Sequence, residues 1–302
     1  MKLRKLHPIL LSFLLPFLPM HPLPVHAAEL TLDQAHQEAL NGNADAQFNL
    51  GKAYYTGTGV PQDYAKAAEF YQKAAEQGNA RAQHNLGTMY TKGLGVPKND
   101  VEAAKWIKKA AEQGAALAQD GMGVFYAKGR GVPKDCNEAA KWYLLAANQG
   151  LAEAEFHLGQ LYLLGDEKFE KNYDEAKKWL SKAAARGKAG AQNCLGVIYE
   201  FGMGVKANPN EAFNWYMKAA EQGEARGESN VGRCYSEAIG VGQDKVQACK
   251  WLLLSADQGE VTAVNYNIAF QRHLKPEQLE EARKLASEFT PKAPSATPIP
   301  SR

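Results

Sequence analysis

The feature that most constrains the fold is a glycine that returns at a nearly fixed interval. It stands at Gly51, Gly87, Gly123, Gly159, Gly196 and Gly232, in steps of 36, 36, 36, 37 and 36 residues. The sequence around it repeats as well, since "AQFNLGKAYYTGTGVPQD" returns as "AQHNLGTMYTKGLGVPKN". A period of this length indicates six copies of one small unit, each of which buries its apolar face against its neighbours.

Other positions recur in phase with this glycine. A tyrosine follows it by three residues in every unit: Tyr54, Tyr90, Tyr126, Tyr162, Tyr199 and Tyr235. A small residue and, three positions later, a large aromatic residue recur in the second half of each unit, as in Ala67 and Phe70 or Ala103 and Trp106. We expect the glycine to let two helices approach closely, facing the alanine column. We expect the aromatic rings to cover the gap between neighbouring units.

Each unit contains the signals of two helices. In the first unit Ala46, Leu50 and Tyr54 are four residues apart, which predicts a helix over 44–56 that ends at the Gly57–Pro61 turn. A short polar residue suited to cap a second helix follows in every unit: Asp63, Asn99, Asp135, Asn172, Asn208 and Asp244. The sequence therefore predicts an all-α chain.

The two ends of the array depart from the repeat. We expect an N-terminal capping helix in 28–43, six repeats over 44–79, 80–115, 116–151, 152–188, 189–224 and 225–260, and a partial seventh repeat with a C-terminal capping helix over 261–289. In the partial unit Ile268 replaces the recurring glycine. Residues 290–302 contain four prolines and one large apolar residue, Ile299, which predicts a disordered Pro-rich tail.

The first 27 residues have the composition of a secretory signal peptide. Lys2, Arg4 and Lys5 precede an apolar run over 9–18, and small residues end the segment at Ala27. The run is about half the ~20 residues that a membrane-spanning helix needs. We expect cleavage near Ala27 and a periplasmic or secreted mature protein. Beyond this segment no apolar run is long enough to span a bilayer.

Charge and reactive residues argue against several functional classes. The formal net charge is +2, and residues 1–27 carry three bases and no acids, so the mature chain is near −1. That balance disfavours nucleic acid as a partner. The four histidines of the mature chain lack the spacing of a zinc helix, and we assign no metal, cofactor or catalytic residue. For Cys234 and Cys249 two alternatives stay open: a disulfide, or two buried small hydrophobic residues.

The repeated pattern resembles the Sel-one-like repeat, a relative of the tetratricopeptide repeat. The residues that carry the resemblance in the first unit are Ala46, Leu50-Gly51, Tyr54, Gly57-Thr58-Gly59-Val60, Asp63, Ala67, Phe70, Ala74-Ala75 and Gln77-Gly78. The resemblance implies a right-handed α-solenoid superhelix whose first helices line a concave groove, and a non-enzymatic adaptor that binds another protein.

Carried onto this sequence, the resemblance implies groove positions six and three residues before the recurring glycine and one and four after it. Those positions include Lys52, Tyr55, Arg81, His84, Thr88, Thr91, Asp120, Gln160, Asn193, Glu200, Arg226 and Arg233. Their mixed polar and aromatic character suits a peptide or protein segment as partner. Two alternatives are a β-lactam-binding or hydrolase-like protein of the cysteine-rich branch of the family, whose regular cysteine pairs this chain lacks, and a peptidoglycan-binding module.

Overall fold

The computed structural model describes residues 32–293, with side chains from His36 onward. The expected signal peptide and residues 294–302 lie outside this part. The described chain forms fifteen helices and no strand apart from an isolated bridge between Asp166 and Phe169. The helices are α1 (Leu32–Leu40), α2 (Ala44–Thr56), α3 (Tyr64–Glu76), α4 (Ala80–Lys92), α5 (Asp100–Glu112), α6 (Ala116–Lys128), α7 (Cys136–Asn148), α8 (Ala152–Leu164), α9 (Tyr173–Ala185), α10 (Ala189–Phe201), α11 (Pro209–Glu221), α12 (Ala225–Glu237), α13 (Lys245–Asp257), α14 (Val261–Gln271) and α15 (Pro276–Ser287).

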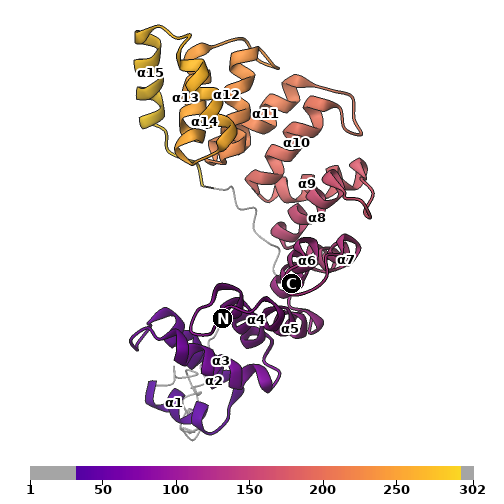
Figure 1. Ribbon diagram of the computed structural model, residues 1–302, viewed down its shortest axis with the longest axis vertical. Helices are drawn as coiled ribbons and strands as arrows, with labels where there is room; N and C mark the ends of the chain where they lie inside the picture. Colours follow the sequence, from indigo (N-terminus) through magenta and orange to yellow (C-terminus); the bar gives the residue numbers. More distant parts are fainter. Residues whose placement is uncertain (1–31, 294–302) are drawn as a thin grey trace, which may run out of the picture.

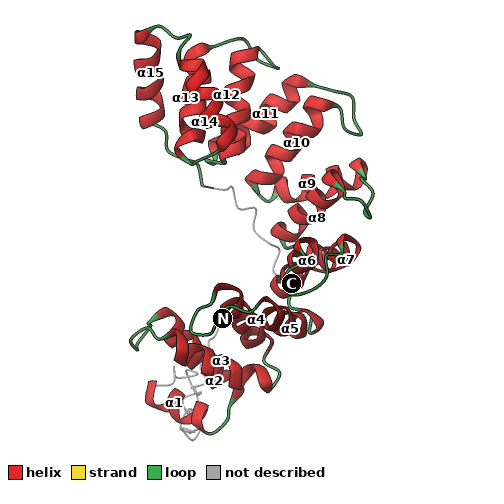
Figure 2. Cartoon of the chain, viewed as in Figure 1, coloured by secondary structure: helices red, strands yellow, loops and turns green. Residues whose placement is uncertain are grey.

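The helices follow one another along an arc, with α1 at one end and α15 at the other (Figure 1). Each unit is a pair of helices joined by a loop, and its second helix also packs on the first helix of the next unit (Figure 2). Every helix therefore contacts only its near neighbours in the sequence, as in a solenoid. The predicted all-α solenoid is confirmed.

The helix ends follow from the capping residues. The side chain of Asn43 accepts a hydrogen bond from the backbone N–H of Ala46 at 2.9 Å, and α2 ends at Gly57, whose φ of 72° is left-handed. Asp63 caps α3 in the same way, accepting from the N–H of Lys66 at 3.0 Å. The helix predicted over 44–56 has these bounds in the structure.

The recurring glycine does bring two helices together, but the alanine column is only part of what it faces. A Cβ on Gly51 would lie 2.8 Å from the ring of Tyr71 and 3.3 Å from the carbonyl oxygen of Ala67. The glycine thus makes room for a large buried side chain of the second helix. The recurring positions identified in the sequence did not include this one. That side chain is Tyr71, Ile107, Tyr143, Leu180, Tyr216 or Leu252 in the successive units.

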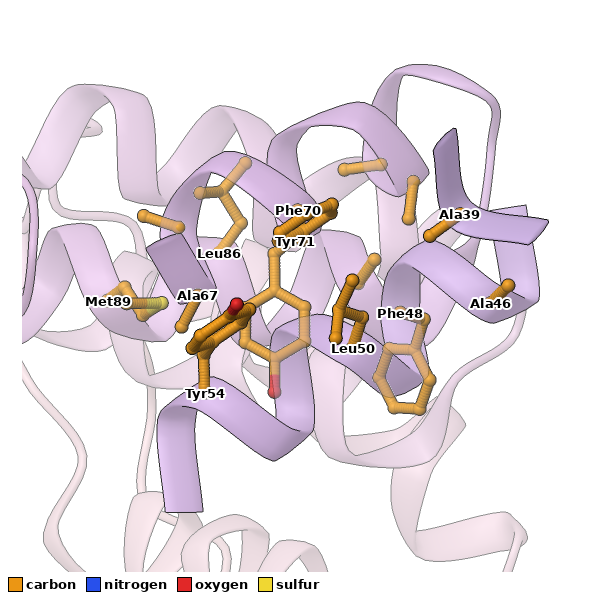
Figure 3. Packing of buried hydrophobic residues seen from close by; sticks show 14 of the residues in the cluster. Ala39, Ala46, Phe48, Leu50, Tyr54, Ala67, Phe70, Tyr71, Leu86 and Met89 are labelled. Carbon is orange, nitrogen blue, oxygen red and sulfur yellow. The ribbon is translucent and has the colours of Figure 1, made fainter. Parts of the chain in front are cut away.

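The aromatic column lies between units, as expected. Trp106 of the second unit is 4 % exposed and belongs to the apolar cluster of the first. In that cluster the rings of Tyr54 and Phe70 stack with centroids 5.9 Å apart, and Leu86 and Met89 of the next unit close it (Figure 3). Each unit's core is therefore completed by its neighbour.

A ladder of buried amides also joins neighbouring units. The side-chain amide of Gln83 donates to the carbonyl oxygen of Ala75 in the preceding second helix at 3.0 Å, and accepts from the amide of Gln113 at 2.8 Å. The same pair recurs as Gln47 with Gln77, Gln119 with Gln149 and Gln192 with Gln222. Glu155 with Arg186 and Glu228 with Gln258 replace it in the fourth and sixth units.

Two loops depart from the repeat in different ways. In the fourth unit Asp166 accepts a hydrogen bond from the thiol of Cys136 at 2.8 Å and lies 3.1 Å from the amine of Lys134. This longer loop is thus bonded to the preceding unit. In the sixth unit Ala238 ends α12 with a φ of 59°, a left-handed conformation that the other units give to glycine in α2, α4, α6 and α10.

The C-terminal end differs from a regular unit. Helix α14 keeps the place of a first helix, with Ala263 fully buried, but α15 packs on α13 instead of on α14. Ile268, at the glycine position, is accordingly 56 % exposed. The first residues of the expected disordered tail make defined contacts: the N–H of Lys292 donates to the carbonyl oxygen of Glu221 at 2.8 Å. The rest of the expected tail, 294–302, lies outside the described residues.

Candidate functional site

The inner surface of the arc is formed by the first helices of the units. Helix α10 packs against both α8 and α12, whereas no two second helices of the six units pack closely in the described chain. Because the first helices α8, α10 and α12 are more closely spaced than the second helices, the solenoid curves toward the first helices there. Side chains on their free faces are therefore gathered into a shared surface.

One hollow on this surface measures about 450 Å³ and crosses four helices. It runs from the end of α8 over the middle of α10 to the start of α12 and α14. Three of the predicted groove residues, Gln160, Asn193 and Arg226, line it. Its other lining residues are Leu163, Leu164, Cys194, Val197, Ser229, Asn230, Glu260 and Thr262.

Hydrogen-bond donors gather along the floor and one end of this hollow. The amide of Asn230 donates to the side-chain oxygen of Asn193 at 2.8 Å, which leaves the amide N–H groups of Asn193 free to donate elsewhere. Arg226 is exposed at the start of α12 and forms no salt bridge in the described part of the chain. Glu260 is used locally, because its carboxylate caps α14 through the N–H of Ala263 at 2.7 Å. The hollow therefore offers unused donors.

The opposite end of the hollow is apolar. Leu164 is 66 % exposed there, beside Leu163 and Val197. Phe201 occupies the matching position on α10 and is 63 % exposed. Sequence reasoning missed this feature, although a signal was present: the other units have Thr56, Lys92, Lys128 and Glu237 at the position five residues after the glycine.

A smaller hollow of about 100 Å³ lies between the first two units. The predicted residues Tyr55 and Thr88 line it with Tyr71 and Asn85. The ring of Tyr55 meets that of Tyr64 edge-on at 5.3 Å, and the hydroxyl of Thr88 donates to its own helix, at the carbonyl oxygen of His84. This hollow is too small for more than one side chain of a partner.

Several predicted groove residues are occupied by partners within the chain. Arg233 forms a two-pronged ion pair with Glu200, at 2.8 and 2.7 Å, and Glu200 also accepts from the hydroxyl of Tyr216 at 2.7 Å. Asp120 lies 2.8 Å from Nδ1 of His157. These groups join consecutive first helices to each other. Their charges are therefore paired within the chain and stabilise the contacts between units, so they are not free to bind a partner.

The remaining predicted residues lie apart from the large hollow. Lys52 is exposed on α2, Arg81 stacks 4.3 Å above the ring of Phe48, and the hydroxyl of Thr91 donates to the carbonyl oxygen of Gly87. His84 is half-buried, and its Nδ1 has no hydrogen-bond partner in the described chain. Burial lowers the pKa of this imidazole, so it is neutral at pH 7.

A third hollow, of about 330 Å³, brings Cys136, His157 and Lys134 to one place between the third and fourth units. Burial and the hydrogen bond to Asp166 raise the pKa of the Cys136 thiol to about 11. The thiol is therefore protonated at neutral pH, the wrong state for a nucleophile. The Cys136 side chain serves to bind the loop.

The cysteines show no disulfide in the described residues. Of the two alternatives for Cys234 and Cys249, the structure has two fully buried free thiols. Burial raises the pKa of Cys234 to about 12 and those of Cys194 and Cys249 to about 11. In residues 32–293 no group of three His, Cys, Asp or Glu side chains is placed to hold a metal ion. No helix there has the length and apolar character to cross a bilayer.

Comparison with known proteins points to one family. The model of the Sel1 repeat matches residues 44–79, 80–114, 116–151, 152–188, 189–224 and 225–260. A Sel1 repeat protein from Oxalobacter formigenes is 35% identical in sequence; the match covers 85% of this chain and 99% of that one, with a TM-score of 0.68. Among curated proteins, none matches this chain.

Two further solved structures are similar at lower TM-scores. A protective antigen of uropathogenic Escherichia coli with the SLR fold is 28% identical over 89% of this chain and 76% of that one, with a TM-score of 0.39. An immunity protein from Pseudomonas aeruginosa is 24% identical over 73% of this chain and 82% of that one, with a TM-score of 0.44. Sel1 repeat proteins are generally non-enzymatic scaffolds for protein–protein interaction. On the six matched repeats and the Oxalobacter structure, the chain belongs to the Sel1 repeat family.

Proposed function

We propose that the mature protein is a non-enzymatic adaptor that binds an extended segment of another protein along the inner face of its solenoid. The observation that carries this proposal is the hollow of about 450 Å³ across α8, α10, α12 and α14. It combines an apolar end at Leu164 with unused donors at Asn193 and Arg226. Extended segments are bound in this way, with the main chain held by hydrogen bonds and side chains placed in pockets.

The dimensions of the hollow set the length of the segment. Packed helices lie about 8–10 Å apart, so the three steps from α8 to α14 span about 24–30 Å. An extended chain rises about 3.3 Å per residue. We therefore expect the bound segment to be about seven to nine residues long.

The proposed place of action follows from the amino-terminal sequence. A basic start, a short apolar run and small residues before position 28 favour export and cleavage near Ala27. We propose that the protein acts in the bacterial envelope or outside the cell. Fractionation of cells and amino-terminal sequencing of the mature protein test this; a mature chain that starts at Met1 in the cytoplasm would refute it.

Site-specific photo-crosslinking in the native envelope tests the adaptor proposal. A crosslinking residue at Gln160 on α8, inside the hollow, is expected to capture the same partner as one at Asn193 on α10, the first helix of the next unit. Lys105, exposed on α5, is the control position. Capture from position 105 but from neither hollow position would contradict the proposal. The same purified protein can be tested for β-lactam turnover and for binding to sacculi, and activity in either assay would favour the other classes.

A further inference from the structure

One side of helix α14 is left uncovered by the described chain. In the first unit, the matching side of α2 packs on the second helix α3. Phe48 there meets the ring of Tyr71 at 5.8 Å, and Gly51 leaves room for the same ring. Tyr55 meets the ring of Tyr64 edge-on at 5.3 Å. Beside α14 no second helix fills this place, because α15 packs on α13 (Figure 1).

The residues at the corresponding positions of α14 are exposed. In the register of the recurring glycine they are Asn265, Ile268 and Arg272. Ile268 is 56 % exposed, and Val261, on the same side of the helix, is 70 % exposed. Together with Ala269 these residues form a surface that we call the terminal face. Exposed apolar residues at a place that the second helix covers in the other units indicate a docking surface.

The opposite end of the solenoid is closed by a polar residue. In α1, Glu38 stands in the column of Ala74, Ala110 and Ala146, which are fully buried in their units, and Glu38 is partly exposed. A polar outer side of this kind is what the end of a solenoid presents to water. Burying its carboxylate against Ile268 would be costly. Helix α1 is therefore a poor partner for the terminal face.

The charges around the terminal face complement those of a second terminal face turned end to end. Helix α14 itself, Val261–Gln271, contains no charged residue. Glu260 precedes it and Arg272 follows it, about 18 Å apart along the helix axis. An antiparallel pair of α14 helices therefore places Arg272 of each copy beside Glu260 of the other, whereas a parallel pair would bring like charges together.

We propose that two copies of this chain associate through their terminal faces, with α14 of one copy antiparallel to α14 of the other. A two-fold axis through the middle of the helix packs Ile268 of each copy over the turn that holds Asn265 in the other. Such a contact uses the same surface twice and is closed, so the assembly stops at a dimer.

The size of the terminal face sets the strength of the dimer. One helix of 11 residues buries less than the about 1,200 Å² of a standard interface, so the association is weak and depends on the protein concentration. The dimer does not depend on any partner in the hollow of the inner face. It is therefore tested separately from the proposed function.

Sedimentation equilibrium of the mature protein, 28–302, between about 5 and 500 µM measures the association. We expect the average mass to rise toward that of a dimer and no further. Ile268→Asp should raise the dissociation constant at least about tenfold, because a carboxylate is then buried in the contact. Arg272→Glu should raise it about fivefold or more by placing like charges side by side. Circular dichroism checks that both variants keep their helices.

Two substitutions serve as matched controls. Val101→Asp changes a residue on α5 that is 62 % exposed, and Glu38→Arg changes the outer side of α1. Both variants should associate as the unchanged protein does.

Crosslinking shows which surfaces meet. Packed helices lie about 8–10 Å apart, so a bismaleimide of about 10 Å span is expected to join two Asn265→Cys copies into a dimer. Lys105→Cys, at an exposed position of α5, should stay monomeric with the same reagent. The unchanged protein gives the background from the native cysteines.

Three results would overturn the proposal. A protein that is monomeric at about 500 µM would do so, whether the terminal face stays free or is covered by residues 294–302. A dimer that Ile268→Asp and Arg272→Glu leave intact would do so too. Loss of association in Glu38→Arg, or growth beyond a dimer, would mean that α1 of one copy covers α14 of the next, and the two-fold pairing would be wrong.

Discussion

Replacing Glu228 by glutamine should stabilise the protein, and more so at high pH. Glu228 is 1 % exposed and stands in the amide ladder, where four other units have glutamine. Its carboxylate accepts from the amide of Gln258 at 2.8 Å, but when ionised it has no N–H to offer the Ala220 carbonyl, the counterpart of the carbonyl that Gln83 binds. Burial above all, and the nearby Glu224 and Asp257, raise its pKa to about 7 from 4.5, against Gln258 and Lys250, which lower it.

The size and sign of the effect follow from these two pKa values. Below pH 4.5 the carboxyl is protonated in both states and contributes no pH-dependent penalty. Between pH 4.5 and 7 the unfolded chain binds fewer protons than the folded one, so the free energy of unfolding falls as the pH rises. Above pH 7 the Glu228 carboxyl is ionised in both states, and the loss in the free energy of unfolding is complete. A pKa shift of this size corresponds to a loss of about 3 kcal/mol.

Urea unfolding of the wild-type and Glu228→Gln proteins at pH 4.5, 6 and 8 measures this difference. The glutamine variant should be more stable by about 3 kcal/mol at pH 8, and the pH-dependent part should vanish at pH 4.5. The matched control is Gln192→Glu, which places an acid at the same position of the fifth unit and should destabilise at pH 8. A stability difference that does not change with pH, or a less stable Glu228→Gln protein at pH 8, would refute the reasoning.

Three further changes test other parts of the fold. Ala238→Gly should raise the free energy of unfolding by about 0.5–1 kcal/mol in urea titrations, because glycine adopts the left-handed φ of 59° without strain; the reverse change at Gly202, whose φ is 66°, should lower it. Trp106→Ala should lower the free energy of unfolding by about 3–5 kcal/mol in the same assay, since the ring is 4 % exposed between two units; a loss below about 1 kcal/mol would contradict that placement. Arg233→Met should lower the melting temperature by removing the ion-pair partner of the Glu200 carboxylate, which is only 9 % exposed, whereas Arg226→Met, at an exposed arginine without a salt bridge in the described chain, should leave it unchanged.

The sequence predicts the parts of the fold that repeat. The recurring glycine, the cap at Asp63 and the covering of each core by an aromatic ring depend on local spacing or on the stacking of identical units, and the structure contains all three. The contents of the inner face were predicted only in part. Gln160, Asn193 and Arg226 line one hollow, but Arg233 and Glu200 neutralise each other across 33 residues. Such a pair depends on how neighbouring units are rotated relative to each other, and the pattern of residues that recur in one sequence does not give that rotation.

The packing of helix α15 could not be predicted from the sequence for a related reason. Its sequence predicts a helix, and Pro276 begins it, but the sequence does not show that it packs away from Ile268. The other units have glycine there, where the second helix presses in, and isoleucine leaves no such room. The second helix then packs on α13 instead.

The loop of the fourth unit has a mechanical consequence. Units in a solenoid touch only their neighbours, so the angle at each junction is inherited by everything beyond it. Asp166, held by Cys136 and Lys134, braces the junction between the third and fourth units, near the midpoint of the arc. A few degrees of rotation there would swing the outer units through a long lever arm. Together with the Asp120–His157 pair at the same junction, this brace therefore helps to fix the distance between the two ends of the molecule.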